Sequence, residues 1–218
     1  IRVWVTGCST GEEAYSIAIL IKEHMLSIGQ NYTVQIFATD IDPKAIAKAR
    51  AGIYPTDIAV DVSAQRLSRF FKAQSNEGTY HIDKSIRDML IFSEQNLIKD
   101  PPFSKLDLIS CRNLLIYLTA SLQKKIIPLF HYALNPGGIL FLGSSETIGE
   151  YENLLAVVDS KSNIYERKEY VTHSHTIGMS KIFPTNDSTR LSTPQLVDKE
   201  IPASKMPLKE LTEHALLD

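Results

Sequence analysis

The sequence predicts an α/β fold, with a doubly wound, mostly parallel β-sheet and a small inserted β-rich subdomain. Two observations lead to this prediction. β-Rich runs alternate along the chain with segments whose apolar residues recur at helical spacing, and one central stretch departs from that alternation. At 218 residues the chain is long enough for one full α/β core and too short for two large ones.

The opening segment predicts two strands, each followed by a helix. Arg2 to Thr6 has the composition of a strand, the glycines of Gly7 to Gly11 interrupt it, and Val34 to Thr39 forms a second apolar run. Pro43 suits the first turn of a helix that continues through Ala45 to Ala51. The first helix is predicted from apolar residues at helical spacing, namely Ala14, Ile17, Ala18, Ile21 and Met25.

Between Gly52 and Ile98 the pattern loosens, and we place the inserted subdomain at about residues 55–90. The region from Gly52 to Ile98 contains a predicted helix near Ser63 to Phe71, a turn at Asn76 to Gly78, and short strands at Thr79 to Ile82 and Met89 to Phe92.

The alternation then resumes. We expect a buried strand at Leu106 to Ser110, a helix from about Thr119 to Ala133, a turn at Asn135 to Gly138, a strand at Ile139 to Leu142, and a closing hairpin of Leu155 to Val158 with Asn163 to Glu166. Residues 1–167 are thus predicted to form one domain, and residues 168–218 a polar tail with a candidate short helix at Leu208 to Leu217.

Composition argues against several classes of protein. The formal net charge of -2 provides no broad basic surface for nucleic acid, and no apolar run approaches the roughly 20 residues that cross a bilayer. The two cysteines have neither metal-ligand spacing nor the density of a disulfide framework. We therefore expect a cytoplasmic protein without membrane insertion and without a metal site.

Three loops carry the candidate binding residues. The first contains Gly7, Cys8, Gly11 and Glu13 between the first strand and the first helix, where ligands bind in doubly wound folds. The glycines also suit a bare turn, and Thr10 with Glu13 fits a capping box. Because Glu12 and Glu13 are adjacent acids, the loop favours a ligand with a positive charge over the pyrophosphate of a nicotinamide dinucleotide.

The second loop places Asp40 and Asp42 at the end of the second strand, where an acid can accept hydrogen bonds from the hydroxyls of a ribose. Capping of the following helix is the alternative interpretation, and a metal site is a weaker one. The third loop presents Arg112, Asn113 and Tyr117 after the buried strand, as donors to a carboxylate and as the wall of a pocket. Alternatively, Arg112 pairs with a structural acid and Tyr117 packs in the core.

Taken together, these stretches resemble the CheR family of chemotaxis-receptor methyltransferases. The resemblance spans about Ile1 to Glu166, and its segments occur in the family's order. They are Gly7 to Ile19 (GCSTGEEAYSIAI), Asp40 to Tyr54, Phe92 to Leu97 (FSEQNL), Cys111 to Tyr117 (CRNLLIY), and Gly137 to Glu146 with its GSSE ending.

The resemblance implies a class I methyltransferase sheet that binds S-adenosylmethionine and esterifies glutamate side chains of chemotaxis receptors. It places the loop of Gly7, Cys8 and Gly11 beneath the methionine part of the cofactor and Glu13 near its amino group. Asp42 holds the ribose, and Asn96 and Leu97 frame the adenine. Arg112, Asn113 and Tyr117 border the transfer site. The strand order of this class also brings Cys8 and Cys111 near the crevice, where we interpret both as apolar filler.

Two alternative functions remain from the sequence. One is a noncatalytic module that senses the cofactor or its product, S-adenosylhomocysteine, and the other is a nicotinamide oxidoreductase. Pro207 to Leu211, followed by Ala215 to Leu217, resembles the segment that leads into sensory domains in longer family members. We therefore expect a fragment of a multidomain hybrid with covalently linked sensory domains.

Overall fold

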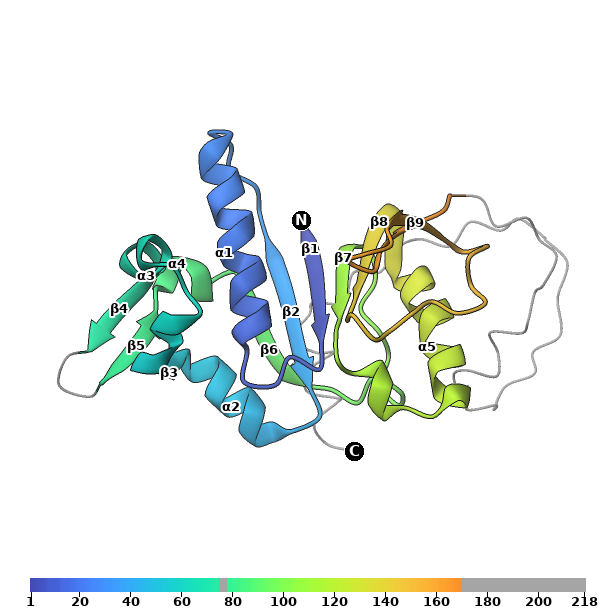
Figure 1. Cartoon of the computed structure of the whole chain (residues 1–218), viewed down its shortest axis with the longest axis horizontal. Coiled ribbons are helices and arrows are strands. Elements are labelled where there is room, and N and C mark those ends of the chain that lie inside the picture. Colours follow the sequence, from blue (N-terminus) through green and yellow to red (C-terminus); the bar gives the residue numbers. More distant parts are fainter. Residues whose placement is uncertain (75–77, 170–218) are drawn as a thin grey trace, which may run out of the picture. The chain divides into compact units, whose positions relative to one another are not determined.

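The computed structural model describes residues 1–74 and 78–169, which form a large sheet and a small one (Figure 1). The large sheet has the strand order β6-β2-β1-β7-β8-β10-β9. β10 pairs antiparallel with both β8 and β9, and all other pairs in this sheet are parallel, so the predicted mostly parallel sheet with a closing hairpin is confirmed. The strands are β1 (Arg2–Thr6), β2 (Gln35–Asp40), β6 (Leu90–Glu94), β7 (Leu106–Cys111), β8 (Leu134–Leu142), β9 (Leu155–Asp159) and β10 (Ile164–Arg167).

Three helices connect these strands, and each begins where the sequence provides a start signal. Helix α1 (Glu12–Ser27) follows Gly11 in a left-handed conformation. Helix α2 (Pro43–Ala51) is capped by Asp42, whose carboxylate accepts from the Lys44 N–H, and has Pro43 in its first turn. Helix α5 (Ala120–Ala133) follows the extended residue Thr119.

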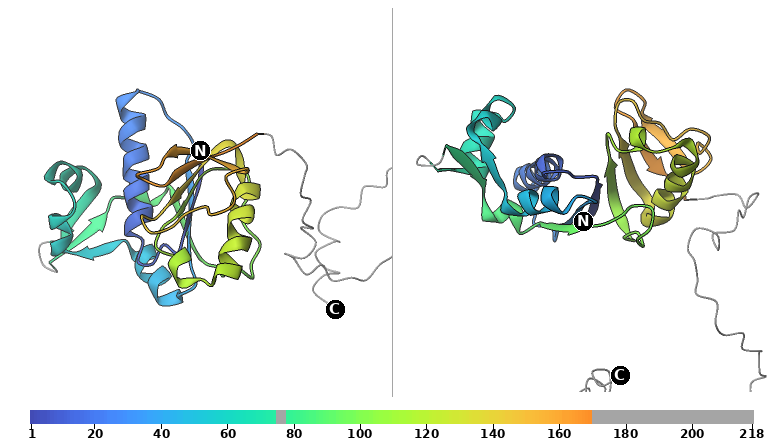
Figure 2. Two further views of the ribbon diagram at one scale, coloured as in Figure 1. Left: turned by 45° about the vertical axis from the view of Figure 1, so that its right-hand side comes forward. Right: turned by 90° about the horizontal axis from the view of Figure 1, so that it is seen from below.

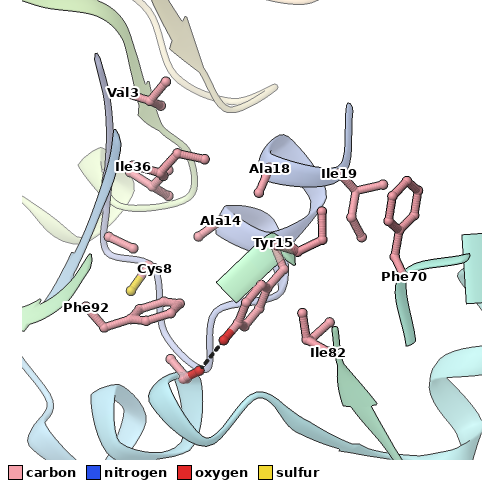
Figure 3. Packing of buried hydrophobic residues seen from close by; sticks show 14 of the residues in the cluster. Val3, Cys8, Ala14, Tyr15, Ala18, Ile19, Ile36, Phe70, Ile82 and Phe92 are labelled. Atoms are coloured by element: carbon pink, nitrogen blue, oxygen red, sulfur yellow. Dashed lines mark hydrogen bonds between the residues drawn. The ribbon is translucent and has the colours of Figure 1, made fainter. Parts of the chain in front are cut away.

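The two faces of the sheet carry separate cores because side chains alternate along each strand. In β1, Val3 and Val5 face a core shared with α1 and α2, whereas Trp4 faces the core that contains the apolar side of α5. Figure 3 shows the first core, in which the Tyr15 hydroxyl also donates to the Ala49 carbonyl at 2.8 Å and so joins α1 to α2. Helices on both faces confirm the doubly wound arrangement.

The inserted subdomain packs on the outer side of α1 (Figure 2). Its Phe70, Ile82 and Ile86 are buried in the same core as Tyr15 and Ile19 of α1. Two of its strands, β3 and β4, were not predicted because one is very short and the other follows its helix without a break. The elements are β3 (Ile53–Pro55), the 3₁₀ helix η1 (Thr56–Val60), α3 (Ala64–Phe70), β4 (Phe71–Gln74), β5 (Thr79–Ile82) and α4 (Lys84–Arg87).

One predicted boundary is wrong. The turn expected at Asn135 to Gly138 lies inside β8, which starts at Leu134. Leu134 pairs with Leu106 and Ile139 pairs with Leu108, so the intervening residues form an irregularity within a continuing strand. Turn-forming residues predicted a break, but pairing with β7 on both sides of them retains the strand.

The predicted tail helix and most of the turn at 76–78 lie outside the described residues. Among residues 1–74 and 78–169, no helix is both long enough and apolar enough to cross a membrane.

Candidate functional site

Four neighbouring strands end at one edge of the large sheet, and the segments there enclose a pocket of about 160 Å³. Four of the sequence-predicted site residues line it, namely Gly7, Asp40, Asn96 and Leu97. The others belong to the loops around the pocket without lining it: Cys8, Gly11, Glu13, Asp42, Arg112, Asn113 and Tyr117. The remaining lining residues, which sequence reasoning missed, are Thr6, Thr39, Ile41, Gln95, Ile98, Leu114 and Leu118.

The loop after β1 owes its conformation to Gly7 and Gly11. Both have positive φ angles, of +63° and +97°. A Cβ on Gly11 would lie 3.0 Å from the Ala49 Cβ and 3.2 Å from the Tyr54 hydroxyl, so the backbone there leaves no room for a side chain. The Cys8 N–H donates to the Thr39 carbonyl at 2.9 Å, which fastens the loop to the end of β2.

Glu13 reaches across this edge to the end of β7 instead of forming a capping box. Its carboxylate accepts from the Ser110 hydroxyl at 2.7 Å and from the Arg112 guanidinium at 3.2 Å. The Thr10 hydroxyl bonds to the Glu12 carboxylate, and the N-cap of α1 is Gly11. The structure thus brings two predicted site residues, Glu13 and Arg112, into direct contact, with the Ser110 hydroxyl as a second donor to Glu13.

The two aspartates after β2 have different roles in the fold. Asp40 accepts from the N–H groups of Ser9 at 2.8 Å and Asp42 at 2.9 Å, so it ties the first loop to the second. One carboxylate oxygen of Asp42 accepts from the Lys44 N–H at 2.8 Å. The alternative that an aspartate caps the helix is therefore correct for Asp42. Its second oxygen has no hydrogen bond within the described part of the chain.

The segment after β6 contributes both polar and apolar groups. Asn96 holds its own turn, because its side-chain oxygen accepts from the Ile98 N–H at 3.0 Å. The Gln95 amide nitrogen donates to the Pro101 carbonyl at 2.9 Å, while its oxygen is buried without a hydrogen-bond partner in residues 1–74 and 78–169. In the sequence, only its position beside Asn96 could have indicated Gln95.

The loop after β7 carries Asn113 in a left-handed conformation, with φ of +57°. Tyr117 is 80% exposed, which contradicts the alternative that it packs in the core. The guanidinium of Arg112 lies over the Phe141 ring, with its carbon 4.8 Å from the ring centroid, as well as beside Glu13. Arg112 therefore does pair with an acid, and that acid belongs to the candidate site.

The two cysteines lie where the predicted strand order places them. Thr6 at the end of β1 pairs with Cys111 at the end of β7, and both thiols are buried. Burial raises the pKa of each to about 12, so both are neutral thiols at physiological pH. This supports their interpretation as packing residues and argues against nucleophilic roles.

A doubly wound sheet with a mostly apolar pocket at its carboxyl edge, and with acids after its first two strands, defines a nucleoside-binding α/β domain. Residues 1–164 match the family profile described as "CheR methyltransferase, SAM binding domain". The chain therefore belongs to the CheR methyltransferase family. S-Adenosylmethionine is the cofactor of this domain, and the sheet is of the class I methyltransferase type that the resemblance implied.

Relatives agree with this family. The chain is 36% identical over 156 residues to the chemotaxis protein methyltransferase of Borreliella burgdorferi, covering 71% of this chain and 55% of that protein. It is 35% identical over 160 residues to chemotaxis protein methyltransferase 2 of Vibrio cholerae, with 72% and 55% covered. A 104.1 kDa protein of Rhodobacter capsulatus is 40% identical over 166 residues, covering 76% of this chain and 17% of that protein. The chain thus spans about half the length of the two named methyltransferases.

The residues present fit this cofactor. Ile41, Leu97 and Leu118 give the pocket apolar walls that suit a flat base, and the unpartnered Gln95 oxygen can accept a hydrogen bond from an amino group. Glu12 and Glu13 place negative charge at the start of α1, which suits an ammonium group better than a phosphate.

Proposed function

We propose that the chain is the catalytic part of a chemotaxis-receptor methyltransferase. It transfers a methyl group from S-adenosylmethionine to glutamate side-chain carboxylates on the cytoplasmic helices of a receptor, giving glutamyl methyl esters and S-adenosylhomocysteine. The observation that carries this proposal is the family match over residues 1–164, with relatives named as chemotaxis protein methyltransferases.

In this proposal, each of four segments, which follow β1, β2, β6 and β7, contacts a different part of the cofactor. Gly7, Cys8 and Gly11 pass beneath the methionine part, and Glu13 accepts from its amino group. Asp42 holds the ribose with the oxygen that the helix cap leaves free, while Asp40 keeps that loop in place. Asn96 and Leu97 frame the adenine, which is supported by their position in the lining of the pocket. Asn113 closes the site on the side of β7.

The proposed reaction requires mainly that the chain align the substrate carboxylate with the methyl group of the cofactor. Bound S-adenosylmethionine supplies a methyl group that its sulfonium has already activated. Since a glutamate carboxylate is ionised at neutral pH, the chain needs no general base and must instead orient the carboxylate and remove water from it. The Arg112 side chain is 38% exposed and its Nε is buried, so the terminal N–H groups that do not bond Glu13 are the ones that orient a substrate carboxylate. Tyr117, with its exposed ring, walls the transfer site.

The proposal also extends to the surroundings of the protein. Its substrate helices place the reaction in the cytoplasm. Covalently linked sensory domains are a further part of the proposal, supported by the match to a segment that is 17% of a 104.1 kDa protein.

Methyl transfer is tested with the natural protein that contains this chain, radiolabelled S-adenosylmethionine and receptor-bearing membranes. We expect base treatment of the labelled receptor to release methanol. Replacement of the proposed orienting group, Arg112→Ala, should lower this release by about tenfold or more, because a charge-assisted hydrogen bond to the substrate is lost. Lys125→Ala is the matched control, since it removes an exposed cation of α5 that makes no ion pair among the described residues.

Retained binding of S-adenosylhomocysteine together with no release of methanol would contradict the proposed activity. That result would instead favour the noncatalytic sensory module.

A further inference from the structure

The carboxylate of Glu146 is buried beside the candidate site and has no role in the function proposed above. Glu146 follows β8 and is 5% exposed. Among the described residues, none of the ion pairs involves it. A buried carboxylate costs free energy unless hydrogen bonds replace its hydration, so its surroundings must supply donors.

Four backbone N–H groups provide this compensation. One oxygen of Glu146 accepts from Leu114 at 2.8 Å and Leu115 at 2.7 Å. The other accepts from Gly143 at 2.7 Å and Asn113 at 3.1 Å. Three of the four donors are consecutive residues of the loop after β7, which lies 31 to 33 positions earlier in the chain. A single side chain thus holds the loop after β7 against the loop after β8.

The residues that donate to Glu146 determine the backbone path of the loop after β7. Asn113 has the left-handed φ of +57°, and it stands directly after Arg112. Gly143 packs closely against this turn and against Glu146, because a Cβ on Gly143 would lie 2.7 Å from a Glu146 carboxylate oxygen and 3.0 Å from the Asn113 nitrogen. The contacts of Glu146 with the turn therefore require a glycine at position 143.

We propose that Glu146 is a positioning residue for methyl transfer: it fixes the turn at Asn113, Leu114 and Leu115, and thereby the directions of Arg112 before the turn and Tyr117 after it. This inference rests on the proposed function, since the loop that Glu146 fixes is the one proposed to border the transfer site. Glu146 acts through this loop and does not touch the reacting groups.

Glu146→Gln is the informative substitution because it preserves shape and replaces one acceptor oxygen, which accepts two hydrogen bonds, by an NH₂ group. Each carboxylate oxygen accepts from two backbone N–H groups. In either orientation of the glutamine amide, its NH₂ group therefore lies against two N–H donors and cannot accept from them. Glu152→Gln is the matched control. It lies on the same connection between β8 and β9, is exposed, and makes no side-chain hydrogen bond in the described part of the chain.

Three quantities are measured on the natural protein: kcat for methyl transfer, the Kd of S-adenosylhomocysteine, and the amide NMR signals of residues 113–115. In Glu146→Gln we expect kcat to fall at least about tenfold, since misplacement of orienting groups by a fraction of an ångström is costly. We expect the Kd to change by less than about threefold, because most of the pocket belongs to segments that Glu146 does not contact. The signals of residues 113–115 should shift, and Glu152→Gln should leave all three quantities unchanged.

A folded Glu146→Gln protein with an unchanged kcat would overturn the proposal. So would a Kd that rises in parallel with the loss of kcat, because that result indicates a general loss of structure. If the variant does not fold, hydrogen exchange of the unsubstituted protein decides: the Leu114 and Leu115 amides should exchange at least about tenfold more slowly than that of Ile116. Equal rates would exclude the restraint. Absence of methyl transfer in the unsubstituted protein would instead refute the proposed function, and the exchange measurement would still test the restraint.

Discussion

At the scale of single residues, Glu13 links the start of α1 to the end of β7. Its spacing from Thr10 fits a capping box, yet its carboxylate bonds Ser110 and Arg112, which lie 97 and 99 positions away. Long-range partners of this kind leave no mark in local spacing, so sequence reasoning could name the acid without naming its contacts.

Gly11 is a residue whose substitution tests the architecture of the first loop. Gly11→Ala should lower the free energy of unfolding by about 2–4 kcal/mol, because a left-handed backbone and a crowded Cβ are both unfavourable. Its φ is +97°, and three side chains lie within 3.3 Å of the position that a Cβ would occupy. Urea denaturation measures the change.

The control is Gly29→Ala, where φ is +65° and no atom lies within 4 Å of the added Cβ. This variant bears only the backbone cost of about 1–2 kcal/mol. Equal destabilisation of the two proteins would show that crowding at Gly11 is unimportant.

At the scale of elements, most helices and strands follow from local patterns, and the errors have a common cause. Strong signals such as Asp42 with Pro43, or the apolar spacing of α1, predict elements that the structure contains. The short strands β3 and β4 and the first half of β8 exist because neighbouring strands supply hydrogen bonds. Pairing between segments distant in sequence overrides weak or contrary local propensity.

The inserted subdomain offers a pH-dependent test at this scale. Asp83 caps α4, accepting from the Ser85 N–H at 2.9 Å, and pairs with Lys72 of β4 at 2.9 Å. The bond from the Lys72 ammonium, together with those from Ser85, lowers the pKa of the Asp83 carboxyl well below its usual range. A pKa that is lower in the folded state stabilises the fold above the unfolded pKa of about 3.9, and this stabilisation is lost as the pH falls toward the folded value.

Asp83→Asn should therefore lower the free energy of unfolding by about 1 kcal/mol near neutral pH, and the difference from the unsubstituted protein should shrink below about pH 4. Denaturation from about pH 2 to about pH 7 measures this dependence, because carboxyl groups titrate within this range. Asp61→Asn, at an exposed aspartate of the same subdomain, is the control. A difference that stays constant with pH would contradict the role given to the Asp83 carboxylate.

At the scale of the whole molecule, segments far apart in the chain meet at one edge of the large sheet. The ends of β1, β2, β6 and β7 are neighbours only because the sheet has the order β6-β2-β1-β7 in that half. This order turns four separate motifs into one pocket. Trp4, the single tryptophan of the chain, lies behind it and donates to the Thr39 hydroxyl at 2.9 Å.

Binding of S-adenosylhomocysteine should therefore both stabilise the fold and change the fluorescence of Trp4. At a ligand concentration 100 times the Kd, the expected stabilisation is about 2.7 kcal/mol, which raises the Tm by about 5–10 °C. Thermal unfolding followed by tryptophan emission measures both effects in one experiment. NAD is the comparison ligand, and stabilisation by NAD but not by S-adenosylhomocysteine would favour an oxidoreductase over a methyltransferase.

By itself, the sequence determined the fold class, the loops that carry the candidate site and the family, because apolar periodicity, helix start signals and ordered motifs are local properties of the chain. Only the tertiary structure decided which of those residues contact one another: Glu13 with Arg112, Asp40 with the first loop, and Glu146 with the turn at Asn113. The physical reason is that these bonds join the ends of different strands, and strand order is set by the packing of the whole sheet.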